Sequence, residues 1–209
     1  MIGPFKAYLF DLDGTLLDSA EDICSAVQHV LSAHVPAPLP FEYLRGFVGF
    51  HLDAVFTDVV PGATREQLDE MIGLYKSTYL ARKHASTQPF PGVSETLARL
   101  GGRKSTATTK SSLTTRAVLE QFGLLQYFDH VQGTDGFPCK PAPDVVRRSL
   151  AVLEVKPEDC LFVGDSVADM EAGRRAGVQI CAVTYGYGKV EALEEWKPDY
   201  CVSDLRQLL

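Results

Sequence analysis

Hydrophobic residues in this chain gather into short continuous runs and into longer stretches with helical spacing. Apolar runs at 7–10, 160–163 and 179–183 are too short for helices, and their aromatic and aliphatic content is typical of buried strands. Between such runs, apolar residues recur with helical spacing, and the helices predicted from them cover 93–100, 112–122, 144–153 and 167–176. Strands that alternate with helices indicate βαβ units, so we predict an α/β fold with a parallel sheet.

A further strand is predicted at 105–108, although serine and threonine make this segment polar for a central strand. Threonine has a good β propensity. The segment ends in a polar group, Thr108-Thr109-Lys110. Polar groups also come directly after the other predicted strands, so this position favours a strand as well.

From 36 to about 85 the pattern is helical and contains no convincing strand. Ser19 with Asp22 forms a variant capping box ahead of one predicted helix, and Thr64 with Gln67 forms a capping box ahead of another. The chain is therefore expected to open with one strand of an α/β domain, to be interrupted by a helical insertion, and then to resume. We predict an α/β core at 1–16 and 87–209 and a helical cap at 17–86.

Composition narrows the class of protein. The chain has 209 residues, with 20 Lys and Arg against 27 Asp and Glu, which gives a net charge of −7. This balance argues against a nucleic-acid partner, since phosphate backbones require a Lys- and Arg-rich face. No run approaches the length of apolar sequence needed to span a membrane, so no membrane partner is expected.

Cysteine usage bears on the compartment. The five cysteines are scattered, odd in number and without a C-x-x-C motif, which fits reduced thiols better than a disulfide framework or a zinc site. Residues 1–7 lack the basic and apolar regions of a signal peptide. A cytoplasmic location is therefore expected.

Four groups of polar residues come at the carboxyl ends of the predicted strands, where open α/β sheets place their ligands. In the first, the carboxylates of Asp11 and Asp13 lie on the same side of an extended chain. The other groups are Thr108-Thr109-Lys110, Lys140 in a proline-rich loop, and Gly164-Asp165-Ser166-Val167-Ala168-Asp169.

These residue types suit phosphoryl transfer. Asp11 and Asp165, from two strands, can hold a hard cation such as Mg²⁺ through oxygen ligands. A lysine and a hydroxyl nearby would supply a positive charge and a hydrogen-bond donor for a phosphoryl group. One carboxylate could then act as a covalent nucleophile and the other as a general acid and base. Phosphoryl transfer needs mostly positioning and charge neutralisation, so this sparse set is enough.

The same residues resemble, in order, the four motifs of the haloacid dehalogenase (HAD) superfamily: Asp11-Leu12-Asp13-Gly14-Thr15, Thr108, Lys140, and Gly164-Asp165-Ser166-x-x-Asp169. Each motif alone is weak, but together they are specific. The resemblance covers essentially the whole chain, because the insertion looks like the helical C1 cap of that superfamily. It implies a Rossmann-like parallel-sheet core with an inserted small α-helical cap domain.

Other residues separate the branches of the superfamily. Dehalogenases and phosphonatases carry a non-acidic residue where Asp13 stands, so neither activity is expected. The segments 11–19, 140–144 and 184–188 look like the phosphoglycolate phosphatase branch, and 44–49 in the cap resembles that branch as well. The β-phosphoglucomutase branch would be expected to show Ser-Arg in place of the Phe-Val pair of the cap.

The resemblance implies a role for each acidic residue. Asp11 attacks phosphorus and is a Mg²⁺ ligand. Asp13 protonates the leaving alkoxide and then activates water, and its backbone carbonyl reaches the metal. Asp165 is a metal ligand, and Asp169 supports either the metal site or Lys140.

Thr108 and Lys140 are implied to bind the phosphoryl oxygens. Thr109 stands where the branch commonly has Asn, and it would be the phosphate-binding hydroxyl if the strand register were one residue later. In the cap, Arg45 is the candidate for contacting a substrate carboxylate, because a guanidinium suits that geometry.

We therefore expect a Mg²⁺-dependent phosphatase that hydrolyses a small phosphomonoester resembling 2-phosphoglycolate through an aspartyl-phosphate intermediate. Its partner would be a small phosphorylated metabolite, and the protein would be a monomer or a weak homodimer. Alternatives in the same superfamily are a pyrophosphatase and a sugar-phosphate phosphatase or mutase. A catalytically idle phosphate-binding scaffold is less favoured, because the acidic residues and Lys140 are intact. A signalling receiver domain is also less favoured, because such domains are shorter and carry no cap.

Overall fold

The protein is described by a computed structural model covering residues 2–209. The chain forms two compact units. The first unit takes in the chain up to Asp18 and from Gln88 to Leu209, and the second takes in Ser19–Thr87. The boundaries lie within two residues of the limits expected for a core and a cap.

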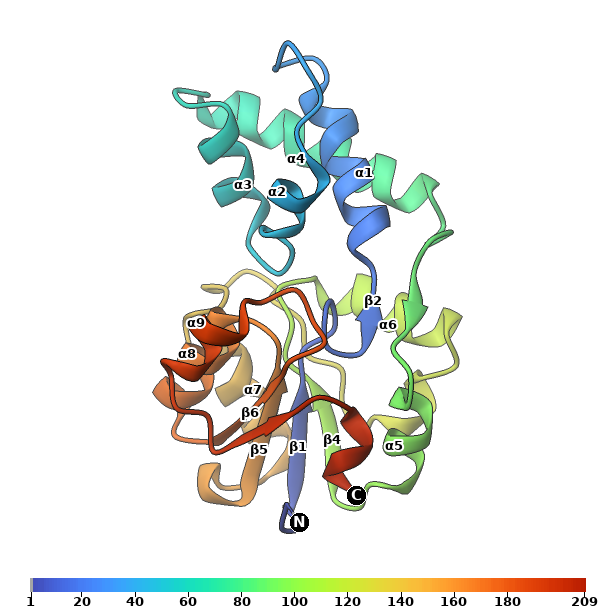
Figure 1. The fold of residues 1–209 in the computed structure, drawn as a ribbon, viewed down its shortest axis with the longest axis vertical. Helices are drawn as coiled ribbons and strands as arrows, with labels where there is room; N and C mark the ends of the chain where they lie inside the picture. Colours follow the sequence, from blue (N-terminus) through green and yellow to red (C-terminus); the bar gives the residue numbers. More distant parts are fainter. Residues whose placement is uncertain (1) are drawn as a thin grey trace. The chain divides into compact units, whose positions relative to one another are not determined.

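A five-stranded sheet forms the centre of the first unit (Figure 1). The strands run in the order β4-β1-β5-β6-β7, and every neighbouring pair is parallel. Their bounds are β1 Ala7–Phe10, β4 Arg103–Thr106, β5 Cys160–Gly164, β6 Gln179–Val183 and β7 Tyr200–Val202. The predicted parallel α/β fold is confirmed. The short strand β7 was not predicted.

Side chains alternate between the two faces of the sheet and build two apolar cores. On β1, Tyr8 and Phe10 join one core, whereas Ala7 and Leu9 join the other. The first core is covered by α5 (Val93–Arg99), α6 (Ser112–Gln121) and the 3-10 helix η3 (Leu205–Leu208). The second is covered by α7 (Asp144–Leu153), α8 (Val167–Ala176) and α9 (Val190–Glu194). Two further 3-10 turns are η1 (Leu125–Tyr127) and η2 (Pro157–Asp159). The sheet is therefore the middle of three layers.

The polar strand β4 lies at the edge of the sheet and begins two residues earlier than expected. Its buried polar groups are paired with the segment that follows η1. The Lys104 N–H donates to Asp129 Oδ2 at 2.7 Å, and the Thr106 hydroxyl donates to the Gln132 carbonyl at 3.0 Å. A polar strand is stable here because these hydrogen bonds offset the cost of burying its side chains.

A two-stranded antiparallel ribbon stands where the chain passes between the units. It pairs β2 (Leu17–Asp18) with β3 (Gln88–Pro89), in the register Leu17 to Pro89 and Asp18 to Gln88. Both strands belong to the first unit, so the chain leaves that unit after β2 and re-enters it at β3. Neither strand was predicted.

The second unit is helical, as the sequence predicts. Its helices are α1 (Ala20–Leu31), α2 (Phe41–Arg45), α3 (Leu52–Val59) and α4 (Arg65–Ala81). The capping box of Thr64 and Gln67 forms as predicted. The other predicted box was wrong. Ser19 is the N-cap residue of α1 but makes no side-chain capping bond, because Asp22 turns instead to Arg82 and Thr87.

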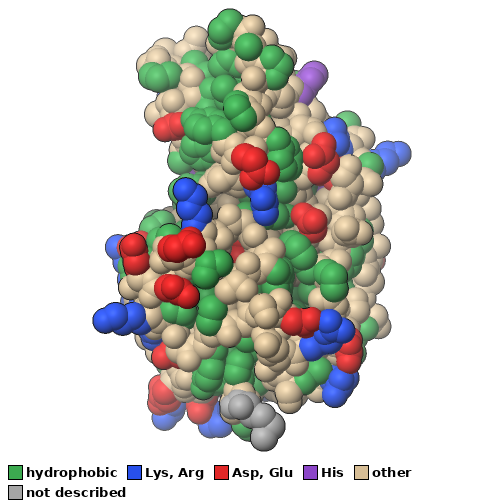
Figure 2. Space-filling view, in the orientation of Figure 1, with side chains coloured by type: hydrophobic (Ala, Val, Ile, Leu, Met, Phe, Trp, Pro, Cys, Tyr) green, Lys and Arg blue, Asp and Glu red, His purple; other side chains and the backbone are tan. Residues whose placement is uncertain are grey.

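Charged side chains of both signs are interspersed on the face shown in Figure 2, without a continuous basic patch on that face. This agrees with the acidic balance of the chain. No helix within residues 2–209 is both long and apolar enough to cross a membrane.

Candidate active site

Lys140 lies at the centre of a buried ionic cluster in the first unit. Its ammonium is 2.8 Å from Asp11 Oδ1 and 2.5 Å from Asp169 Oδ1. Asp11 follows β1 and Asp169 lies in the first turn of α8, so the cluster joins groups from different elements. All three side chains are at most 3% exposed. A fully buried ammonium must be paired with negative charge, and these two carboxylates provide that pairing for Lys140.

Asp165 follows β5 and is held by groups from two other segments. The Thr15 hydroxyl donates to its Oδ1 at 2.9 Å, and the Tyr187 N–H donates to its Oδ2 at 2.9 Å. The turn that carries Thr15 also requires Gly14, which has a φ of +88°. A Cβ added at Gly14 would lie 2.2 Å from Asp165 Oδ2, so a larger residue would displace this carboxylate.

Asp169 is fully buried, and both of its oxygens are bonded within the protein. Oδ1 faces Lys140, while Oδ2 accepts from the Ser166 N–H at 3.0 Å and from the Ser166 hydroxyl at 2.6 Å. Ser166 in turn caps α8 through the Asp169 N–H. Asp169 thus orients Lys140 from the start of a helix, in keeping with the supporting role expected from the sequence.

Three carboxylates, those of Asp11, Asp165 and Asp169, each offer an oxygen within 4.8 Å of the others. Burial raises the pKa of Asp11 to about 7, although Lys140 opposes the shift. Burial and the charges of Asp11 and Asp169 raise the pKa of Asp165 to about 8. The cluster is therefore short of positive charge, and its oxygen donors suit a divalent cation.

The side chain of Asp13 faces Lys110. Lys110 Nζ is 2.6 Å from Asp13 Oδ2, and the two side chains are 13% and 6% exposed. No role was predicted for Lys110 from the sequence. The signal available was its place two residues after Thr108, at the same sheet edge as Asp13.

Thr108 is buried in the loop after β4, and its hydroxyl accepts a 3.4 Å hydrogen bond from the Lys110 N–H. Its carbonyl accepts from the Thr134 hydroxyl at 2.9 Å. Thr109 is the next residue and is half-buried. Because β4 ends at Thr106, both threonines lie in the loop rather than in the strand, and the choice between them as phosphate ligand stays a prediction.

Arg45 belongs to the second unit, at the end of α2. Its guanidinium is 3.2 Å from Glu42 Oε2, one turn earlier on the same helix. Its predicted contact with a substrate carboxylate stays a prediction.

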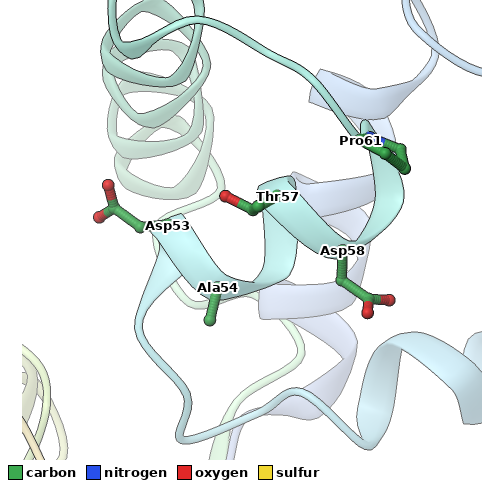
Figure 3. Close-up of a pocket in the computed structure, with 5 residues that line it drawn as sticks. All are labelled: Asp53, Ala54, Thr57, Asp58 and Pro61. Carbon is green, nitrogen blue, oxygen red and sulfur yellow. The ribbon is translucent and has the colours of Figure 1, made fainter.

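A shallow hollow of about 660 Å³ also lies in the second unit, along α3 and the turn after it (Figure 3). The two acidic side chains that line it, Asp53 and Asp58, point away from one another. Asp53 pairs with Arg65 and with His51, and Asp58 accepts a 2.6 Å hydrogen bond from the Tyr43 hydroxyl. These acids are engaged in holding the unit together, so the hollow is not a second candidate site.

Comparison with known proteins identifies the family of the chain. The family model described as haloacid dehalogenase-like hydrolase matches residues 8–183. The chain is 33% identical over 214 residues to phosphoglycolate phosphatase 1 of Pseudomonas aeruginosa, covering 98% of this chain and 78% of that protein. It is 32% identical over 207 residues to the pyrophosphatase PpaX of Bacillus velezensis, covering 97% and 94% respectively.

Solved structures give the same result. A haloacid dehalogenase-like hydrolase from Bacteroides fragilis superposes with a TM-score of 0.92 at 28% identity, covering 98% of this chain and all of that one (100%). The expected parallel-sheet fold thus agrees with the matched family. The chain belongs to the haloacid dehalogenase-like hydrolases, and within that family it is a phosphoric monoester hydrolase.

Proposed function

We propose that this protein is a Mg²⁺-dependent phosphatase that hydrolyses a small phosphomonoester through an aspartyl-phosphate on Asp11. The observation that carries the proposal is the buried ionic cluster in which Lys140 contacts Asp11 and Asp169, beside Asp165. This cluster combines a carboxylate nucleophile with a fixed positive charge. It also has enough oxygen donors for a divalent cation.

In the first step, a carboxylate oxygen of Asp11 forms a bond to phosphorus while the bond from phosphorus to the leaving oxygen breaks. Asp13 donates a proton to that oxygen. In the second step, Asp13 takes a proton from water as the water oxygen attacks phosphorus, and the bond to Asp11 breaks. Lys140 and the hydroxyl of Thr108 or Thr109 would bind the phosphoryl oxygens, which carry the charge in both steps.

Mg²⁺ fits the donor set because it prefers oxygen ligands and retains waters. Asp11 and Asp165 would hold it by their side chains, with Asp13 contributing its backbone carbonyl. When bound, the ion would neutralise charge on the phosphoryl group and allow Asp11 and Asp165 to remain ionised. Asp169, whose oxygens are already bonded, would act through Lys140.

The substrate we propose is 2-phosphoglycolate or a close analogue. The support comes from the names of several relatives, among them the Pseudomonas aeruginosa protein, and from segments 11–19 and 184–188. Arg45 is the proposed ligand for the substrate carboxylate. The Bacillus relative supports a pyrophosphatase as the second candidate. The free cysteines suit a reducing compartment, so we propose a cytoplasmic location.

The test is phosphate release, with and without Mg²⁺, from 2-phosphoglycolate, pyrophosphate and sugar phosphates. We expect 2-phosphoglycolate to have the highest kcat/KM, and we expect Asp11→Asn to abolish turnover of every compound. Turnover that survives in Asp11→Asn would overturn the assignment of the nucleophile. A preference for pyrophosphate would favour the second candidate. An Arg45→Ala variant with unchanged kcat/KM on 2-phosphoglycolate would remove Arg45 from the site.

A further inference from the structure

The segment Gly186-Tyr187-Gly188 follows β6 and crosses directly over Asp165. A Cβ added at Gly186 would lie 2.3 Å from Asp165 Cβ, and one added at Gly188 would lie 1.9 Å from the Asp165 carbonyl oxygen. Neither position can accept a side chain without moving one of the segments. Between them, the Tyr187 N–H donates to Asp165 Oδ2 at 2.9 Å. This segment therefore determines where one carboxylate of the cluster lies.

The side chain of Tyr187 reaches a different part of the molecule. Its hydroxyl donates to Asp18 Oδ1 at 3.0 Å, and Asp18 is the residue of β2 that pairs with Gln88. Its ring lies 6.4 Å, between centroids, from that of Phe90, the residue directly after β3. The Phe90 N–H donates to the Leu16 carbonyl at 3.0 Å and so extends the ribbon. Tyr187 thus contacts β2 and the residue directly after β3, at the ribbon through which the chain passes between its units.

We propose that Tyr187 is a positioning residue that couples the placement of Asp165 to the order of the β2–β3 ribbon. A shift of the ribbon moves the Tyr187 side chain, and the backbone N–H of the same residue transmits the shift to the Asp165 carboxylate. By linkage, a ligand that fixes Asp165 must also stabilise the ribbon. The inference rests on the proposed function only in taking Asp165 to be a Mg²⁺ ligand.

The test uses Mg²⁺ alone and needs no turnover. The rate of amide hydrogen exchange at Phe90 measures how ordered the ribbon is. The dependence of the Tm on Mg²⁺ concentration measures the affinity of the cluster for the ion. In the native protein, we expect saturating Mg²⁺ to slow exchange at Phe90 about fivefold. In Tyr187→Phe, which keeps the N–H and loses the hydroxyl, we expect less than half of that slowing and an approximately threefold weaker affinity for Mg²⁺, because only part of the energy of the lost hydrogen bond is coupled to the cation site.

Asp18→Ala removes the acceptor from the other end of the contact and should reproduce both effects. The double variant should be no worse than Tyr187→Phe alone, because Asp18 Oδ1 and the Leu17 carbonyl, 3.5 Å away, both accept from the same hydroxyl. Tyr127→Phe, in η1 of the same unit, is the matched control and should behave as the native protein does. Unchanged Mg²⁺ affinity and unchanged slowing at Phe90 in both Tyr187→Phe and Asp18→Ala would overturn the inference.

The outcome is separable from that of the proposed function. A native protein that binds Mg²⁺ and shows the coupling, but turns over no phosphomonoester, would contradict the proposed function alone. A native protein that turns over phosphomonoesters without binding Mg²⁺ would overturn this inference.

Discussion

The ammonium of Lys110 lies 2.6 Å from Asp13 Oδ2, across 97 residues of sequence. The pair joins the loop after β4 to the turn after β1, which are neighbouring strands of the sheet. The carboxylate of Asp13 is turned toward this lysine, while the carboxylates of Asp11, Asp165 and Asp169 converge on one another. Lys110 thus fixes the direction of the side chain that we propose as the acid and base.

Replacing Lys110 should impair proton transfer to the leaving group more than it impairs binding. We expect Lys110→Met to lower kcat on 2-phosphoglycolate by about 100-fold, the lower end of the contribution of a general acid or base. The first step on p-nitrophenyl phosphate should be slowed much less, because p-nitrophenolate leaves without needing a proton. The second step, in which Asp13 takes a proton from water, should be slowed on both substrates. Pre-steady-state release of p-nitrophenolate and steady-state turnover of 2-phosphoglycolate check this prediction.

Lys110→Arg is the matched control, since it keeps the charge and should recover part of the activity. Pre-steady-state release of p-nitrophenolate that is slowed as much as turnover of 2-phosphoglycolate would indicate a structural role for Lys110 and contradict the prediction.

Much of the fold was predictable because the sheet is buried on both sides. The strands β1, β5 and β6 are continuous apolar runs, and such runs are conspicuous in any sequence. The strand β7 and the ribbon strands were missed since they have only two or three residues each. Ribbons of this length are defined by tertiary contacts such as that of Tyr187 with Asp18, which no local pattern reveals.

The site was predictable where its residues follow strands. Asp11 and Asp165 come after β1 and β5, which are neighbours in the sheet, so their proximity follows from the parallel fold. The orientation of side chains was not predictable. Lys110 was given no role from the sequence, yet its side chain is only 13% exposed and pairs with Asp13. Similarly, Asp22 was expected to cap α1 and instead pairs with residues near position 85.

Lys140 should be needed for stability as well as for activity. Its ammonium is the buried positive charge that faces both Asp11 and Asp169, and these two carboxylates raise its pKa although burial works to lower it. We expect Lys140→Met to abolish turnover and to lower the free energy of unfolding by about 3 kcal/mol, because buried carboxylates lose their counter-charge. Chemical denaturation without divalent cations measures the loss.

Mg²⁺ should compensate for part of this loss in Lys140→Met. An ion that binds only the folded state stabilises it by mass action, and the variant has a more negative cluster. The rise in Tm on adding Mg²⁺ should therefore be larger in Lys140→Met than in the native protein. A smaller rise would mean that Lys140 is required to form the cation site.

Asp22 should make the second unit sensitive to acid. Burial works to raise its pKa, but hydrogen bonds from Thr87, Arg82 and the Ser86 N–H outweigh burial and lower the pKa below its ordinary value of 3.8. A group with a lowered pKa in the folded state stabilises the protein fully above the ordinary pKa, and this contribution is lost as the pH falls through the folded value.

We therefore expect Asp22→Asn to cost about 2 kcal/mol of unfolding free energy at pH 7, with the cost shrinking below about pH 4. Urea denaturation of both proteins from pH 7 down to pH 3 checks the prediction. Asp69→Asn is the control in the same unit, because Asp69 is 60% exposed in its pair with Arg65 and should have little effect at any pH. A cost of Asp22→Asn that does not change with pH would contradict the assigned cause.

Gly14 tests how closely the turn after β1 must approach Asp165. Its φ of +88° is strained for any other residue, and an added Cβ would meet Asp165 Oδ2 at 2.2 Å. We expect Gly14→Ala to lower stability by about 1–2 kcal/mol from the backbone alone and to weaken Mg²⁺ binding by displacing Asp165.

Gly62→Ala is the matched control, since Gly62 has the same φ of +88° with open space around the position of an added Cβ. Gly62→Ala should lose only the backbone contribution to stability, Gly14→Ala should lose at least as much, and only Gly14→Ala should lose Mg²⁺ affinity. The dependence of the Tm on Mg²⁺ concentration measures the affinity of each variant. Equal affinities would mean that the close packing of Gly14 on Asp165 does not determine the geometry of the cation site.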